Sequence, residues 1–246
     1  MFKKKLTITF ALALILVVLF AAGITAGATN GSAVETRTID VASFDRIIVA
    51  GNWDVVYVEA ASHSIRVVMP AEWFDRYNFN VVRDTLRVER NLRSRQTRWD
   101  GPARPLIYVY APSLDGMSLS GSADATSSSV IRAEDFRLNV SGNAGANLNF
   151  NISGALTLNA TGRAEVTMSG TTRYLTITGA GINSIHAFDL EARYARNVSI
   201  AGVGVVEVTA IETLNVRVGG TARVYYRGNP TITQRTTGAG RLINAN

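Results

Sequence analysis

The sequence has no cysteine, two histidines and only three lysines, and all three lysines stand at positions 3–5. Without cysteine the chain has no thiol nucleophile, no iron–sulfur cluster and no thiolate zinc site. The two histidines, His63 and His186, lie far apart in the sequence, so a histidine-based metal or acid–base site is not indicated. We therefore expect no metal, no cofactor and no catalytic residue.

A strong charge of one sign is also missing from most of the chain. The formal net charge of the 246 residues is +6, but without the three lysines 22 arginines face 19 acidic residues, a net charge of +3. Nucleic-acid-binding domains carry a larger and more clustered excess of basic residues. We expect no nucleic-acid partner. With 47% hydrophobic and 18% charged residues, the chain has the composition of a folded protein with a sizeable core.

The N-terminal segment, positions 1–28, has the composition of a secretion signal. Three lysines precede 13 consecutive apolar residues, Phe10 to Ala22, and small residues follow up to Ala28. We expect cleavage after Ala28 and export to the periplasm, the outer cell envelope or the extracellular space. The alternative is an uncleaved N-terminal anchor, because the 19 residues from Leu6 to Ile24 approach the length of a membrane span. The membrane would then be contacted through this leader alone.

The main signal downstream is an internal repeat marked by glycine, which recurs about every 20 positions. The repeat origins are Gly121, Gly142, Gly162, Gly179, Gly202, Gly220 and Gly238. Two positions after each origin stands a small residue: Ala123, Ala144, Ala164, Gly181, Gly204, Ala222 and Gly240. Apolar residues alternate with polar ones on both sides of most origins, which is typical of β-strands.

This pattern predicts an all-β protein in which each repeat is one coil of a β-solenoid. Stacking would place equivalent positions about 4.8 Å apart and build a continuous apolar core. We expect about seven coils in residues 117–246. Residues 29–116 lack the glycine repeat and are predicted to form an N-terminal β cap layer. We expect Trp53 and Trp73 to be packing residues in this layer. The alternative architecture is a two-sheet sandwich of regular hairpins, which also has alternating strands.

The strongest concentration of one charge lies between positions 87 and 104. Six arginines there face only Glu89 and Asp100. Arginine binds carboxylate and phosphate groups through two parallel hydrogen bonds, and an exposed tryptophan can stack on a sugar. The candidate ligand-binding residues are Arg93, Arg95, Arg98, Trp99 and Arg104. The alternative is a solvated insertion with Trp99 folded onto the protein.

Carbohydrate-active enzymes also occur on parallel β-helices, and they would require paired carboxylates. Asp124 and Glu165 occupy the same position in repeats that are two coils apart, at about 10 Å, which is too far for a retaining glycosidase and marginal for an inverting one. The other acidic residues are scattered. A polysaccharide-active enzyme is therefore the least favoured interpretation.

Four segments in a fixed order resemble the family named "putative auto-transporter adhesin, head GIN domain". They are FDRIIVAGNWDVVYVEA (Phe44–Ala60), LIYVYAPSLDGMSLSGSADA, GAGINSIHAFDL (Gly179–Leu190) and RVYYRGNPTITQRTTGAGRL. The arginine-rich segment and the Gly219–Thr221 repeat depart from the family pattern. The resemblance implies a right-handed β-helix-like fold, an envelope or surface location and an adhesive role, and it supplies no catalytic residues.

We therefore expect an exported, non-catalytic, adhesin-like module. A regular outer face of Thr, Ser and Asn, together with the arginine-rich segment, would contact a cell-surface glycan, lipopolysaccharide or another envelope component. The alternative is a passive envelope scaffold that self-associates as a homo-oligomer through its sheet faces or ends.

Overall fold

The structure, a computed structural model, describes residues 33–91 and 104–246. The predicted leader, residues 1–28, lies outside them. The described residues are all-β, and one short 3₁₀ helix is the exception. The elements are β1 (Val34–Asp40), β2 (Arg46–Gly51), β3 (Asp54–Glu59), β4 (Ser64–Pro70), η1 (Ala71–Arg76), β5 (Tyr77–Val82), β6 (Thr85–Arg90), β7 (Leu106–Ala111), β8 (Gly116–Gly121), β9 (Asp124–Ser127), β10 (Ile131–Ala133), β11 (Phe136–Gly220), β12 (Arg223–Arg227), β13 (Thr231–Thr236) and β14 (Arg241–Asn244).

All these strands belong to one hydrogen-bonded sheet. Its main path runs β1-β4-β7-β3-β9-β11-β8-β2-β6-β5, and β10, β12, β13 and β14 join it through β11 or β12. Within the described ranges, no helix is long and apolar enough to cross a membrane. Antiparallel pairs occur only in the N-terminal part, between β1 and β4, β4 and β7, and β5 and β6. Every other pair is parallel.

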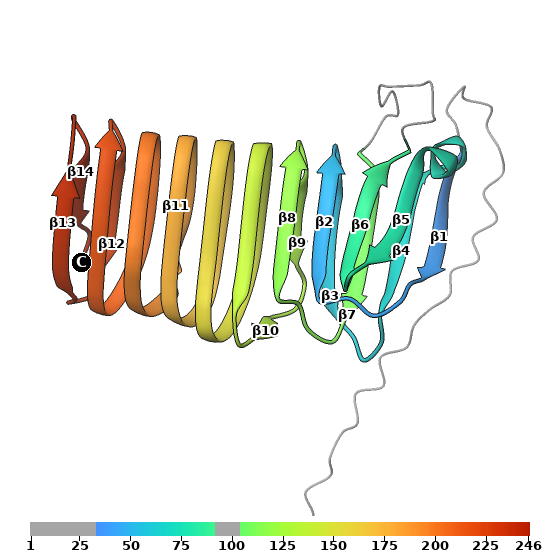
Figure 1. Cartoon of the computed structure of the whole chain (residues 1–246), viewed down its shortest axis with the longest axis horizontal. Helices are drawn as coiled ribbons and strands as arrows, with labels where there is room; N and C mark the ends of the chain where they lie inside the picture. The colour runs from blue at the N-terminus through green and yellow to red at the C-terminus, as the bar shows by residue number, and fades with distance from the viewer. Residues whose placement is uncertain (1–32, 92–103) are drawn as a thin grey trace, which may run out of the picture. The chain divides into compact units, whose positions relative to one another are not determined.

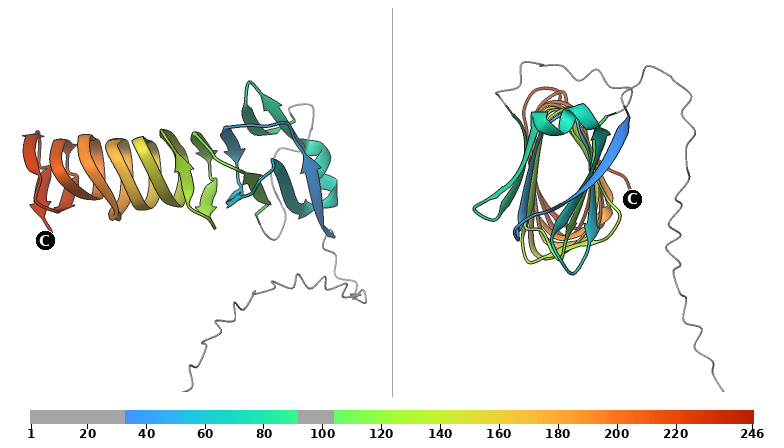
Figure 2. Two further views of the ribbon diagram at one scale, coloured as in Figure 1. Left: turned by 90° about the horizontal axis from the view of Figure 1, so that it is seen from below. Right: turned by 90° about the vertical axis from the view of Figure 1, so that its right-hand side faces the viewer.

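The 85-residue strand β11 passes repeatedly across the sheet, and each pass lies beside the previous one (Figure 1). The right-hand view of Figure 2 shows these passes overlying one another. At its start Gly142 pairs with Gly121, and at its end Val206 pairs with Val224 and Val218 with Thr236, always in parallel. Parallel neighbours cannot be joined by tight hairpins. This pairing therefore disagrees with the alternative of a hairpin sandwich.

The strand register shows that one of the predicted repeat origins, Gly179, was assigned to the wrong glycine. The residue that stacks on Gly162 is Gly181, which has a φ of +99°, and a Cβ on Gly181 would lie 2.5 Å from the carbonyl oxygen of Gly162. Gly179 has no positive φ and faces the core instead. The prediction of Gly179 was wrong because two glycines two residues apart fit the same strand alternation.

The glycine column also begins earlier than the sequence indicated. Gly51, in β2, pairs with Gly121 in β8, and β3 pairs in parallel with β9. A Cβ on Gly121 would lie 2.9 Å from the carbonyl oxygen of Gly51, so the close approach of backbones is the same as in later repeats. Parallel stacking therefore extends back to residue 46.

The corrected register places Asn183, not Gly181, in the column of small residues. Asn183 is fully buried, and neither polar atom of its side chain has a hydrogen-bond partner within the described part of the chain. Its amide nitrogen lies 3.3 Å from where a Cβ of Gly179 would be, so the missing side chain of that glycine leaves room for the amide. The expectation that this column holds only Ala and Gly was wrong at this repeat.

The inward-facing residues form one continuous core from Phe44 to Val224. Among its largest side chains are Trp53 and Phe136, both almost completely buried. Trp73, in η1, is also buried, so the expectation that Trp53 and Trp73 are packing residues is confirmed. Burial alternates with a period of two along most of β11, which leaves every second side chain there on an outer face.

Candidate binding surface

Four of the five predicted ligand-binding residues, Arg93, Arg95, Arg98 and Trp99, lie outside the described residues. The fifth, Arg104, is described, and its two terminal guanidinium nitrogens are engaged. One forms ion pairs with Asp54 (3.1 Å) and Asp124, and the other donates to the carbonyl oxygens of Trp53 (2.7 Å) and Ser122.

Arg104 stabilises the sheet at this position. Asp54 and Asp124 are register partners on neighbouring parallel strands, so their carboxylates stack with like charge. Such pairs destabilise a sheet unless a counter-charge is supplied. Arg104 supplies it from within the chain. A ligand-binding role for the five residues stays a prediction, and the surface described next does not depend on it.

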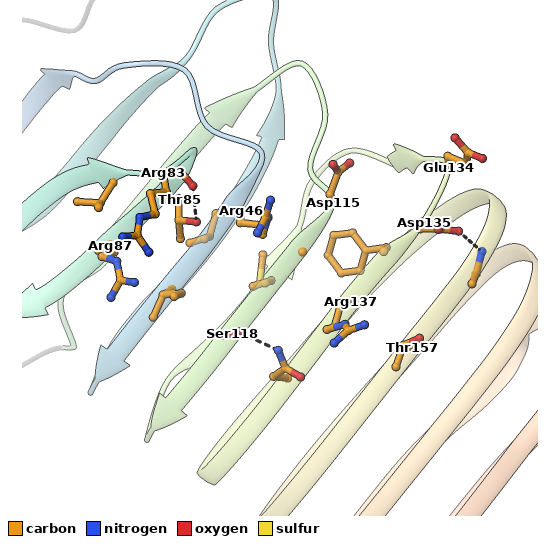
Figure 3. Close-up of a pocket in the computed structure, with 18 residues that line it drawn as sticks. Arg46, Arg83, Thr85, Arg87, Asp115, Ser118, Glu134, Asp135, Arg137 and Thr157 are labelled. Atoms are coloured by element: carbon orange, nitrogen blue, oxygen red, sulfur yellow. Dashed lines mark hydrogen bonds between the residues drawn. The ribbon is translucent and has the colours of Figure 1, made fainter.

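A pocket of about 920 Å³ opens on the outer face of β6, β2, β8 and the first passes of β11 (Figure 3). Most of the side chains that line it are polar or charged. They include four arginines, three acidic residues and several hydroxyl or amide groups: Arg46, Arg83, Arg87, Arg137, Asp115, Glu134, Asp135, Thr85, Ser118, Asn139 and Thr157. A volume of this size accommodates a small oligosaccharide fragment as well as other ligands of drug-like size.

Two of the arginines stand on either side of a glycine. Gly116 in β8 pairs with Arg46 on one side and with Arg137 on the other, so the two arginines are two strand spacings, about 10 Å, apart. A Cβ on Gly116 would lie 3.0 Å from the carbonyl oxygen of Arg137 and 3.6 Å from the Cγ of Arg46. The glycine thus forms a low floor between two exposed guanidinium groups.

The next row along the strands is a ladder of hydrogen-bonded amides and hydroxyls. The Nδ2 of Asn139 donates to the Oγ of Ser118 at 3.0 Å, and the Nδ2 of Asn159 donates to the Oδ1 of Asn139 at 2.9 Å. Each of these bonds uses one amide hydrogen, so the donor inventory of the row leaves the Ser118 hydroxyl hydrogen and a second hydrogen on each amide for other partners. This row belongs to the Thr, Ser and Asn face that the alternation predicted.

Acidic residues stand at one edge of the pocket. Burial raises the pKa of the Asp115 carboxyl above its usual value, and the nearby charge of Asp45 acts in the same direction. The Oδ1 of Asp135 accepts a hydrogen bond from the backbone of Ala155 at 2.7 Å (Figure 3). Arg46 forms an ion pair with Asp45 at 3.0 Å. The pocket is therefore a mixed-charge surface whose cationic side chains flank its floor.

Sequence reasoning missed the pocket because its arginines come from separate segments. Arg87 was noted as part of the arginine-rich stretch, but Arg46 and Arg137 are 91 positions apart in the sequence and meet only through the register with Gly116. The ladder was recognisable as polar outward positions. Its hydrogen bonds depend on the length of each repeat, which strand alternation does not reveal.

Other acid–base groups do not gather into a second site. Gly145 lies between Asp124 and Glu165. A Cβ on Gly145 would lie 2.6 Å from the Oδ1 of Asp124 and 3.3 Å from the carbonyl oxygen of Glu165. His186 pairs with Glu207 at 2.9 Å. Residues 33–91 and 104–246 contain no group of three or more side chains placed to bind a metal ion.

The described chain is therefore all-β, with successive passes paired in parallel and a polar pocket on an outer face. Residues 43–230 match the family described as "Putative auto-transporter adhesin, head GIN domain", and the chain belongs to this family. No curated protein matches the chain at a significant level.

Solved structures share the fold. A putative adhesin from Bacteroides fragilis aligns with a TM-score of 0.77 and 19% identity, over 87% of this chain and 97% of its own. A "putative lipid binding protein" from Parabacteroides distasonis aligns with a TM-score of 0.66 and 22% identity, over 88% and 98%. A putative adhesin from the same organism aligns with a TM-score of 0.63 and 19% identity, over 87% and 98%.

Proposed function

We propose that this protein is an exported, non-catalytic adhesin-like module that binds an anionic glycan of the cell envelope through its outer polar face. Membership of an adhesin family supports a surface role. The secretion-signal composition of residues 1–28 supports export. The pocket around Gly116, with its flanking arginines and its amide ladder, supports recognition of a ligand that carries both hydroxyl and acidic groups.

We further propose that the fold is a right-handed β-solenoid of about seven coils. The parallel register supports this architecture, because Gly121 pairs with Gly142 and Val206 pairs with Val224, in each case one repeat further along the chain. A constant offset of about one repeat is what successive turns of a single coil require.

The observation that carries the binding proposal is the row Arg46–Gly116–Arg137 beside the ladder Ser118–Asn139–Asn159. Two exposed arginines whose backbones lie two strand spacings, about 10 Å, apart attract carboxylate, sulfate or phosphate groups, and the neighbouring ladder offers hydrogen bonds to sugar hydroxyls. A neutral glycan would use only the ladder. An anionic glycan would use both rows, so we expect it to bind more tightly.

The test is a binding screen of the purified full chain against neutral and anionic glycans, including lipopolysaccharide, at low and physiological salt. We expect salt-sensitive binding of anionic glycans that weakens about tenfold in Arg137→Ala. Arg163→Ala is the matched control, because Arg163 is an exposed arginine of β11 that does not line the pocket. A blank panel, or an equal loss in both variants, would contradict the proposal.

The alternative, a self-associating scaffold, is favoured by one observation. In the described part of the chain β13 pairs only with β11 and β14 only with β12, so each has an unpaired edge. Exposed edges are templates for pairing with another chain. Sedimentation at increasing concentration distinguishes the two functions, since a scaffold would form larger species without any ligand.

A further inference from the structure

The C-terminal end of the described chain has an unusual charge. Residues 213–246 contain five arginines and no acidic residue, whereas residues 33–91 and 104–212 together contain 14 arginines and 18 acidic residues. The five are Arg217, Arg223, Arg227, Arg235 and Arg241. Positive charge is therefore concentrated on β12, β13, β14 and the last pass of β11, at the end of the sheet opposite β1 and β5 (Figure 1).

Strand register brings four of these arginines together in like-charged pairs. Arg223 on β12 is the register partner of Arg241 on β14. Arg217 on β11 is the register partner of Arg235 on β13. Neighbouring strands lie about 4.8 Å apart, and like charges directly opposite one another destabilise a sheet.

None of these four side chains has an acidic partner among the described residues, since every ion pair found there involves other arginines or His186. The stacked pair Asp54 and Asp124 has Arg104 between its carboxylates, but the pair Arg223 and Arg241 has no equivalent in the described part of the chain. An external anion can therefore supply the counter-charge for this pair.

The face that carries Arg223 and Arg241 offers further groups for a ligand. Ala222, just before β12, and Val224 on β12 are buried, so Arg223, Tyr225 and Arg227 share the outer face. The guanidinium of Arg227 lies over the ring of Phe188, 4.0 Å from its centre, which restrains an otherwise flexible side chain. Arg227 is four residues from Arg223, about 13 Å along the strand, with the half-buried ring of Tyr225 between them.

We propose that Arg223 and Arg241 form a binding site for a phosphate monoester, with Tyr225 and Arg227 contacting the group that carries it. The charge argues for phosphate over carboxylate. A phosphate monoester carries a charge of about −1.5 to −2 at neutral pH and several acceptor oxygens, which matches two adjacent guanidinium groups, whereas one carboxylate neutralises only one. The site shares no residue with the pocket at Gly116 and goes beyond the function proposed above.

The first experiment is thermal unfolding of the full chain with inorganic phosphate, compared with chloride at equal ionic strength. We expect phosphate to raise the Tm of the wild-type chain. Without phosphate, Arg241→Gln should melt about 1–3 °C above wild type, because the repulsion with Arg223 is removed. Phosphate also stabilises folded proteins in general because it is excluded from their surface, so this variant should gain clearly less stability from phosphate than the wild-type chain does.

Arg163→Gln is the matched control, because it removes an exposed arginine from the middle of β11 and should keep the full response to phosphate. An unchanged wild-type Tm in phosphate, or an equal loss of the response in Arg163→Gln, would overturn the proposal. Arg137→Ala should also keep the response, so the failure of the pocket and the failure of this site can be told apart.

Two sources of phosphate are then distinguished by direct binding. The probes are mannose 6-phosphate against mannose, and vesicles of phosphatidylcholine with phosphatidic acid against phosphatidylcholine alone. Binding of the sugar phosphate that weakens about tenfold in Arg241→Gln assigns the site to a phosphorylated glycan. The same loss on the acidic vesicles assigns it to a lipid headgroup. Binding of neither probe would overturn the proposal.

Discussion

The two ends of the described sheet are closed in different ways. At the N-terminal end the parallel stack continues into antiparallel strands, β4 and β1 on one side and β5 on the other, and η1 contributes the buried Trp73. At the C-terminal end two core columns become polar in β13 instead, while Leu242 of β14 still packs against the core. Val216 and Val218 of the apolar core are followed in register by Gln234 and Thr236. One end is covered by added strands and a 3₁₀ helix, whereas the other ends in two short strands with partly polar side chains.

The two ends of the sheet also differ in charge. The outer column through Asp54 and Asp124 begins with acidic residues, which Arg104 bridges with one positive charge, and it ends with Arg223 and Arg241, which have no acidic partner in the described chain. Like charges in register are thus tolerated in two ways. At the N-terminal end an internal counter-ion stabilises them, and at the C-terminal end they remain available to an external one.

The largest effect should come from substitutions in the glycine column. Their cost should differ between the interior of the stack and its free C-terminal end. Gly162 and Gly238 have similar φ values, +87° and +76°, and a Cβ would lie 2.6 Å and 2.9 Å from the carbonyl oxygen of the preceding glycine. We expect Gly162→Ala to lower the free energy of unfolding by about 3 kcal/mol, because repeats on both sides prevent relaxation. Gly238→Ala should cost about 1 kcal/mol, because the last repeat can shift.

Urea unfolding of both variants measures this difference. Equal losses would mean that the terminal repeat is as constrained as the interior, and the contrast between covered and free ends would not hold.

The second effect tests the internal counter-ion. Arg104→Gln should destabilise the chain by about 1–2 kcal/mol, since it leaves the carboxylates of Asp54 and Asp124 stacked without a positive charge. Arg241→Gln, the corresponding change at the other end, should have the opposite sign. Both are measured by urea unfolding in chloride. A stabilising Arg104→Gln would show that the acidic pair needs no partner.

The third effect concerns the buried amide in the column of small residues. Asn183→Ala should stabilise the chain by about 1 kcal/mol, because it removes a fully buried polar group without a partner in the described chain. Ala164→Asn, at the same position one repeat earlier, should destabilise it, because Ala160 stands where the later repeat has Gly179 and its side chain occupies that space. A destabilised Asn183→Ala would indicate that the amide has a hydrogen-bonding role.

The smallest expected effect is a pH dependence of ligand binding at the pocket. The raised pKa of Asp115 means that the folded chain takes up a proton more readily than the unfolded chain, so the contribution of this carboxyl to stability falls as pH rises through that pKa. Protonation also removes a negative charge from the pocket. An anionic glycan should bind about two- to threefold more tightly as pH falls from neutral to about 4.

Binding titrations of wild type and Asp115→Asn check this expectation. The variant should bind more tightly at neutral pH and respond less to acidification. An unchanged pH response in the variant would show that Asp115 does not cause the effect.

Much of the architecture could be predicted from the sequence because it depends on local patterns. Alternation of apolar and polar residues identified β-strands and the polar outer face that includes Ser118 and Asn139. The recurring glycines indicated the repeat, and the segments around Phe44 and Gly179 indicated the family, which is confirmed. Trp53 and Trp73 were assigned to the core correctly.

The sites could not be predicted in the same way, because they depend on register between strands. Gly179 and Gly181 fit the alternation equally, and only contact with Gly162 distinguishes them. Arg104 looked available for a ligand until the fold placed it between Asp54 and Asp124.

The sequence by itself determined the strand character, the mean repeat length of about 20 residues and the family of this protein, because these follow from patterns along the chain. Only the tertiary structure decided that Arg46 and Arg137 flank Gly116, and that Arg223 stacks on Arg241. The physical reason is that neighbours across a parallel stack are separated in the chain by at least one whole repeat. A difference of one residue in repeat length changes which side chains meet and moves them to the opposite face of the sheet.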